Sequence, residues 1–212
     1  MSEDTVFALS SPVGGAIAIV RITGSGAYAA LGRVFRCKNA PEHRVMNYGH
    51  VIDSESGETI DSAMACFLEA PATYTGEDMA EIYIHGSRVI AKRTLSVLSR
   101  FLRPAEGGEF TKRAFMNGKL DLSQAEAVMD VISSVTEQGA RMAEEQLAGS
   151  IGSGIKDIED RLIDILSGVE AALDYPDELE EDTVSALGSE LAPIIDTVSY
   201  THLRAHETDQ YL

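Results

Sequence analysis

The stretch AIAIVRITGSGAYAALGRVF, residues 16–35, decides the fold of the first half of the chain. It begins with a continuous apolar run over 16–20, rich in β-branched residues, which lies between the glycine-containing turns 14–15 and 24–26. Such a run, bounded by turn residues, is typical of a buried strand. The spacing of apolar residues over 27–35 then predicts a short helix. A strand followed at once by a helix indicates a domain that mixes both kinds of element.

Further elements are expected after this stretch, strands where apolar and polar residues alternate and helices where the apolar residues have helical spacing. They are a hairpin of residues 45–52 and 60–68 around a turn at 53–57, a strand over 81–85, and a helix over 89–102 that Pro104 ends. The first half therefore predicts an α+β fold.

The character of the sequence changes at Ser123. The string Ser123-Gln124-Ala125-Glu126 is a capping box, and the apolar residues that follow it share one helical face. We expect a long amphipathic helix that the glycines of 149–154 interrupt or kink, and that resumes over 155–173. We therefore expect these helices to pack as an antiparallel pair or bundle.

A third amphipathic helix is predicted over 182–198, with a cap at Asp182 or Thr183. The residues from 199 onward break both the apolar period and the acidic composition. We interpret 199–212 as a tail that is foreign to the fold or disordered.

The chain carries 34 acidic against 17 basic residues, a formal net charge of −17. Residues 1–120 are balanced, with 13 of each sign, whereas 121–212 hold 4 basic and 21 acidic residues. This charge argues against a protein that grips a phosphate backbone, and the acidic helical positions are interpreted as a solvated face.

Cys37 and Cys66 are the only cysteines, without a C-x-x-C motif or a nearby histidine pair. They are interpreted as buried free thiols in a reducing compartment, and no zinc site is expected. The acidic N-terminus does not suit a signal peptide, and the apolar run 13–22 is too short to cross a bilayer. We therefore expect a cytoplasmic protein with no membrane attachment.

Two glycine motifs are weak evidence for a nucleotide-binding site. Gly24-x-Gly26-x-x-Ala29 formally fits a dinucleotide fingerprint, but no acidic residue follows at the end of a next strand, so a plain turn is favoured. The glycines of 149–154 lack the lysine and hydroxyl of a phosphate-binding loop. No catalytic triad can be assembled, and His85 is interpreted as a turn-capping or core histidine.

Three dense clusters of polar residues remain, at 74–86, 107–115 and 117–122. Charged groups lie there among Phe110 and Phe115, where they are costly unless they are paired or bind a ligand.

With these clusters the sequence resembles the MnmE (TrmE) family of tRNA-modification GTPases, over about residues 4–196. Four strings in order carry the resemblance: DTVFALSSPVGGAIAIVRITG, TYTGEDMAEIYIHG, GGEFTKRAFMNGKLDLSQAEAVMDVI and ALDYPDE. It implies a tetrahydrofolate-binding α+β domain over 1–118, similar in fold to the folate domain of the glycine-cleavage aminomethyltransferase, and an α-helical segment over 119–198 that is part of a helical domain.

In that family a GTPase domain, which binds GTP, magnesium and potassium, interrupts the helical domain, and a cysteine motif closes the chain. Neither is found here, so we expect a fragment without catalytic residues of its own.

The resemblance also implies a folate site of Arg21, Glu81 and Lys119. A pterin presents a ring N–H beside an exocyclic NH₂, a donor pair that a carboxylate such as Glu81 accepts. Arg21 and Lys119 would meet the carbonyl and the glutamyl tail of 5,10-methylenetetrahydrofolate, for which 5-formyltetrahydrofolate is a stable analogue. The alternatives are a structural ion pair for Arg21 and an ordinary surface lysine for Lys119. Gly107 departs from the proline that is usual in the family.

By the same resemblance, the complete protein would dimerise through its N-terminal domain and act with an FAD-containing, MnmG-like partner. Together they would add an aminomethyl-type group to carbon 5 of the wobble uridine of tRNA. Two alternatives stay open: a stand-alone folate-dependent enzyme of the aminomethyltransferase kind, and a dimerisation module without catalysis.

Overall fold

The computed structural model describes residues 4–174 and 189–199 of the chain. Packing separates two compact units, of which the first ends at Ala143 and the second begins at Glu144. The predicted boundary near residue 118 stays a prediction, because the helices that follow it still pack with the first unit up to Ala143.

The first unit is built on a sheet of seven strands in the order β3-β4-β5-β6-β2-β1-β7. Neighbouring strands are antiparallel except β1 and β7, which are parallel. The strands are β1 Val6–Leu9, β2 Ile17–Thr23, β3 Phe35–Cys37, β4 Asn47–Ile52, β5 Thr59–Leu68, β6 Met79–His85 and β7 Arg103–Pro104.

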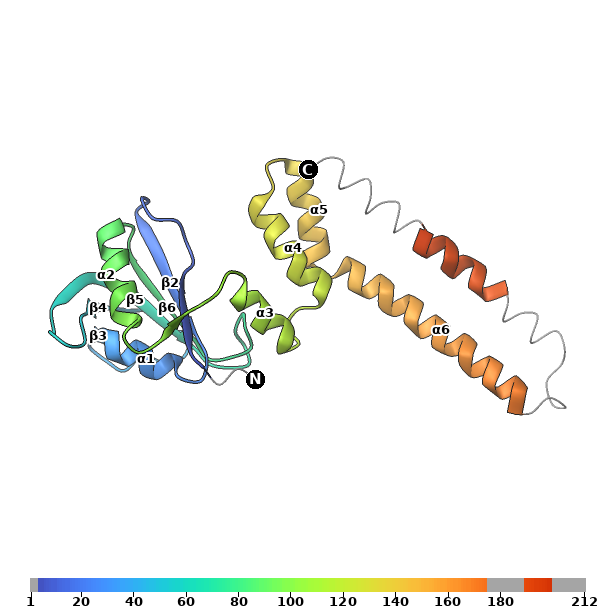
Figure 1. Ribbon diagram of the computed structural model, residues 1–212, viewed down its shortest axis with the longest axis horizontal. Coiled ribbons are helices and arrows are strands. Elements are labelled where there is room, and N and C mark those ends of the chain that lie inside the picture. Colours follow the sequence, from blue (N-terminus) through green and yellow to red (C-terminus); the bar gives the residue numbers. More distant parts are fainter. Residues whose placement is uncertain (1–3, 175–188, 200–212) are drawn as a thin grey trace. The chain divides into compact units, whose positions relative to one another are not determined.

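One face of the sheet is covered by two helices, α1 Ala27–Val34 and α2 Arg88–Leu98. Both pack against β6, and they also contact each other (Figure 1). Alternate residues of each strand point into this core, which includes Val20, Ile82 and Ala65. The opposite, open face presents the intervening residues of the same strands. These facts confirm the α+β expectation for the first half of the chain.

The predicted helix over 89–102 is wrong at its C-terminal end. α2 ends at Leu98, and the N–H groups of Arg100 and Phe101 donate to the carbonyls of Val97 and Leu98 in a turn. The chain has to leave the helix there because Arg103 and Pro104 form β7 beside β1. The hairpin, the helix after residue 27 and the strand that ends at His85 are confirmed.

Three helices follow the sheet: α3 Glu109–Met116, α4 Leu122–Ser133 and α5 Glu137–Leu147. The predicted capping box at Ser123 is wrong by two residues. Asp121 is the N-cap of α4, its side chain accepts from the N–H of Gln124, and the Gln124 side chain accepts from the N–H of Asp121. The same reciprocal arrangement therefore occurs one half-turn earlier.

The long helix expected from this point is divided at residues 134–136. Ser133 and Ser134 turn their hydroxyls back to backbone carbonyls, and Thr136 accepts from the N–H of Gly139 at the start of α5. Local serine and threonine hydrogen bonds of this kind compete with the helical ladder. The expected apolar face lies open in the described structure, where Ile132 is 72% and Val135 96% exposed.

The second unit contains α6, Ser150–Asp174, and a helix over 189–199. The predicted interruption falls at Gly149, which has a φ of +88°, whereas the glycines at 152 and 154 lie inside α6. The predicted cap at Asp182 or Thr183 and residues 200–212 of the predicted tail lie outside the described residues. None of the described helices is long and apolar enough to cross a membrane.

Candidate functional site

Arg21 and Glu81 lie side by side on the open face of the sheet. They are register partners of the antiparallel strands β2 and β6, and Arg21 Nε donates to Glu81 Oε1 at 2.8 Å. The Glu81 side chain is only 14% exposed, whereas that of Arg21 is 38% exposed. The pair is therefore half withdrawn from water, with the carboxylate deeper than the guanidinium. No described residue accepts from the two terminal nitrogens of Arg21.

Tyr83 holds the second oxygen of the same carboxylate. It lies two residues beyond Glu81 on β6, so both side chains project from the same face, and its phenol donates to Glu81 Oε2. Burial first, and then the hydrogen bond to Glu81, raise the pKa of Tyr83 to about 12. The phenol therefore stays protonated, and a donor, at physiological pH.

Cys66 lies beside Glu81 on the side opposite to Arg21. It is the register partner of Glu81 on β5, and it is 8% exposed. Burial and the neighbouring carboxylate raise the pKa of the thiol, so it stays neutral. The expected buried free thiol is confirmed for Cys66, while Cys37 is only half-buried.

A loop over residues 73–78 borders the site at the end of β2. Thr23 hydrogen bonds Thr75 at 2.7 Å, both hydroxyls being buried, and the Asn117 side chain donates to the Thr75 carbonyl at 2.8 Å. Gly76 has a φ of +77°, and a Cβ there would lie 3.2 Å from the side chains of Asn117 and Lys119. A glycine is therefore required at this position of the T-G-E-D motif.

Lys119 lies against this loop and not against the carboxylate of Glu81. Its Nζ donates to the carbonyl of Pro71 at 3.2 Å. The structure therefore brings Arg21 and Glu81 into direct contact, and it connects Lys119 to them only through the loop, whose Thr75 binds Thr23 two residues beyond Arg21.

A buried charge cluster holds the same loop from the other side. Arg113 of α3 is 5% exposed and pairs with Glu77 at 3.0 Å, with Glu109 at 2.8 Å and with Asp4 at 3.0 Å. Of the charged groups that the sequence placed in the cluster 107–115, Glu109 and Arg113 are thus paired with each other.

His85 ends β6 at the far end of the open face. Its Nδ1 lies 2.7 Å from Asp61 Oδ1, and its backbone N–H donates to Asp61 Oδ2 at 2.8 Å. The His85 side chain is 65% exposed and that of Asp61 only 7%. His85 is therefore not a core histidine, as one expectation had it, but an exposed ring anchored on a buried carboxylate. Beside it, a hollow of about 360 Å³ is lined by Tyr48, Met64 and Tyr83, among others.

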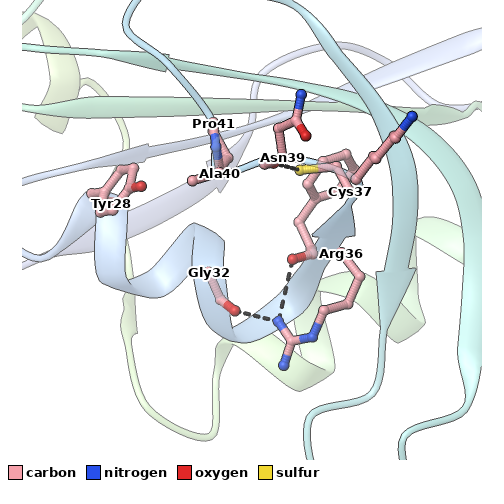
Figure 2. Close-up of a pocket in the computed structure, with 9 residues that line it drawn as sticks. Tyr28, Gly32, Arg36, Cys37, Asn39, Ala40 and Pro41 are labelled. Atoms are coloured by element: carbon pink, nitrogen blue, oxygen red, sulfur yellow. Dashed lines mark hydrogen bonds between the residues drawn. The ribbon is translucent and has the colours of Figure 1, made fainter.

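A second hollow, of about 300 Å³, lies between α1 and the segment that follows β3 (Figure 2). Figure 2 shows the side chains of Arg36 and Cys37 turned to backbone carbonyls: Arg36 donates to Gly32 and Phe35, and Cys37 donates to Asn39 at 2.8 Å. None of the residues that the sequence proposed for a ligand lines it.

The turn that formally resembles a dinucleotide fingerprint is closed by the chain itself. A Cβ at Gly24 would lie 2.8 Å from Thr5 Cα, and the N–H of Gly26 donates to Thr5 Oγ1. The interpretation of residues 24–29 as a strand-to-helix turn is confirmed, because the backbone that would face a phosphate faces Thr5.

Sequence reasoning missed Tyr83 and did not single out Arg113. Tyr83 was part of an alternating string that predicted only a strand, and its spacing of two from Glu81 was the available signal. Arg113 was inside the cluster 107–115, but its buried partner Glu77 is remote in sequence.

Two family models match the chain. The model described as "GTP-binding protein TrmE N-terminus" matches residues 5–119, and "MnmE helical domain" matches residues 122–211. The chain belongs to the MnmE family. The resemblance inferred from the four sequence strings is thereby confirmed.

Three relatives named tRNA modification GTPase MnmE show the extent of the likeness. The chain is 43% identical over 188 residues to that of Lactobacillus delbrueckii subsp. bulgaricus, with 86% of the chain and 40% of the relative covered. It is 44% identical over 190 residues to MnmE of Streptococcus pyogenes serotype M3, covering 87% and 42%. It is 39% identical over 206 residues to MnmE of Carboxydothermus hydrogenoformans, covering 93% and 45%. The chain therefore spans about two fifths of the length of these MnmE relatives.

Proposed function

We propose that this chain is the part of an MnmE-type tRNA-modification GTPase that binds the tetrahydrofolate one-carbon donor. The observation that carries the proposal is the cross-strand pair of Arg21 and Glu81 on the open face. A carboxylate that is mostly withdrawn from water and held in place is suited to accept from two adjacent N–H donors, such as those of a pterin.

The residues present fit such a ligand. Glu81 supplies the paired acceptor, and the terminal nitrogens of Arg21 are available for a carbonyl oxygen. Lys119 offers a cation whose one hydrogen bond to the described residues goes to the Pro71 carbonyl, and it can meet a glutamyl carboxylate. When bound, methylenetetrahydrofolate supplies the one-carbon unit, while this chain would bind and orient it.

The wider assignment follows from the names of the relatives. We propose that the complete protein acts in the cytoplasm, with an FAD-containing MnmG-like partner, to add an aminomethyl-type group to carbon 5 of the wobble uridine of tRNA. GTP hydrolysis would belong to a domain that is not part of this sequence. The homology supports this assignment, since the relatives that match over most of the chain bear the name tRNA modification GTPase.

We also propose that the first unit forms a homodimer. Its open sheet face carries large apolar side chains, with Ile17 60%, Tyr48 67% and Met64 44% exposed, which supports contact with a second copy. Light scattering on the purified chain and on a Tyr48→Lys variant tests this: the variant should shift toward monomer.

Calorimetric titration with 5-formyltetrahydrofolate tests the folate proposal. The chain should bind, and Glu81→Gln, which removes the charge but keeps the shape, should lose most of the affinity. Glu58→Gln is the matched control, because Glu58 lies just before β5, is 63% exposed and pairs with Arg93. A well-folded dimer that binds no folate would instead favour the dimerisation module.

A further inference from the structure

Two protein donors already hold the carboxylate of Glu81, one on each oxygen. Arg21 Nε donates to Oε1 and the Tyr83 phenol donates to Oε2. An ionised carboxylate has about four lone-pair sites. Two of them, one on each oxygen, thus stay available while the carboxylate group is held at both ends.

Tyr83 is itself held in a fixed place. Its register partners are Ile19 on β2 and Met64 on β5, so the ring lies in a cross-strand row of the open face. The phenol stays protonated because burial and the carboxylate both oppose its ionisation. Tyr83 can therefore act only as a donor toward Glu81 at physiological pH.

We propose that Tyr83 is a positioning residue of the folate site, whose phenol fixes the Glu81 carboxylate so that both oxygens accept together from the paired N–H donors of a 2-amino-4-oxopteridine ring. This inference rests on the proposed folate function and assigns the residue that makes the site selective for a donor pair. A carboxylate held by Arg21 alone could rotate about its last bond, and it would then accept one donor as readily as two.

Tyr83→Phe tests the assignment, since it removes one oxygen atom and keeps the ring in the row. The affinity for 5-formyltetrahydrofolate should fall about two- to tenfold, because the freed Glu81 carboxylate would have to be immobilised when the ligand binds. The decisive readout is selectivity. The chain should prefer 5-formyltetrahydrofolate over its 2-desamino analogue, and Tyr83→Phe should reduce that preference at least threefold.

Tyr28→Phe is the matched control. Tyr28 lies on α1, on the covered side of the sheet, and its hydroxyl makes no hydrogen bond to any residue that the structure describes. It should leave both affinities and their ratio unchanged. A purely structural role for Tyr83 would weaken both ligands equally and keep the ratio, which overturns the inference while the folate function stands.

The unsubstituted chain gives a second measurement that does not depend on the folding of a variant. The carbon-13 resonance of the phenol-bearing ring carbon of Tyr83 reports hydrogen-bond donation. It should keep its position when 5-formyltetrahydrofolate saturates the site, whereas a shift to the value of a free tyrosine means that the ligand displaces Tyr83 and overturns the inference. Absence of any binding by the unsubstituted chain overturns the folate function, and this inference with it.

Discussion

Arg113 Nη1 lies 3.0 Å from Glu77 Oε2, and the two side chains are only 6% and 9% exposed. The pair joins α3 to the loop before β6, and the same guanidinium also binds Glu109 and the N-terminal Asp4. Three segments that are distant in sequence are therefore tied together at one buried cation beside the candidate folate site.

Replacing Arg113 with alanine should lower the free energy of unfolding of the first unit by about 3–5 kcal/mol, because Glu77 would be left buried and unpaired. Urea denaturation followed by circular dichroism measures the loss. Arg93→Ala is the control: its pair with Glu58 is exposed, and such pairs contribute under about 1 kcal/mol. Equal losses in the two variants would contradict a buried role for Arg113.

Glu109 should make the first unit sensitive to acid. The hydrogen bonds from Arg103, and then from Arg113, lower its pKa from 4.5 to about 2 in the folded protein. Between these two values the unfolded chain takes up a proton that the folded chain does not, so the free energy of unfolding falls as the pH drops from 4.5 toward 2.

Thermal unfolding across that pH range tests the assignment. Glu109→Gln should be less stable at neutral pH and should show a shallower decline in acid. An unchanged slope would place the acid sensitivity in other carboxylates.

Gly107→Pro should stabilise the first unit by about 0.4–1 kcal/mol, mainly by restricting the unfolded chain. Gly107 is not among the residues with positive φ, its N–H makes no hydrogen bond to the described residues, and a Cβ there meets nothing within 4 Å. Gly108→Ala is the contrasting variant. Gly108 has a φ of +76°, so alanine should destabilise. Differential scanning calorimetry should show a higher melting temperature for Gly107→Pro and a lower one for Gly108→Ala. A Gly107→Pro variant with a lower melting temperature would contradict the expected stabilisation.

Asp61→Ala should destabilise the sheet by about 1–3 kcal/mol, since the backbone N–H of His85 would lose its acceptor at a half-buried position. The His85 ring would also lose its anchor, visible as averaging of its resonances in NMR spectra. Ser62→Ala, at the exposed neighbouring position, should change stability by less than about 0.5 kcal/mol. A rigid His85 ring in the alanine variant would show that another group holds it.

Strong local patterns in the sequence predicted most of the first unit. Alternation around the turn at 53–57 predicted the β4–β5 hairpin, and the glycine-bounded run at 16–20 predicted β2. The end of α2 was not predictable in this way. Leu102 continues the apolar spacing, but the pairing of Arg103 with β1, almost a hundred residues earlier in the chain, decides where the helix stops.

The helical segment was harder to predict, because its breaks depend on side-chain hydrogen bonds. Ser133, Ser134 and Thr136 divide α4 from α5, although the apolar pattern continues through them. Of the site, Arg21 and Glu81 were identified by family resemblance, and cross-strand register brings them together. The contact of Tyr83 with Glu81 could not be predicted in this way, because it depends on the strand register and on the position of the hydroxyl, and alternation alone does not give these.

The sheet of the first unit ends in two very short strands. β3 has three residues and β7 has two, and Pro104 of β7 has no N–H to offer. An incoming strand would find too little free backbone at either border to form a ladder. Edge-to-edge pairing between copies of this chain, the route by which separate sheets fuse into fibres, is thereby disfavoured.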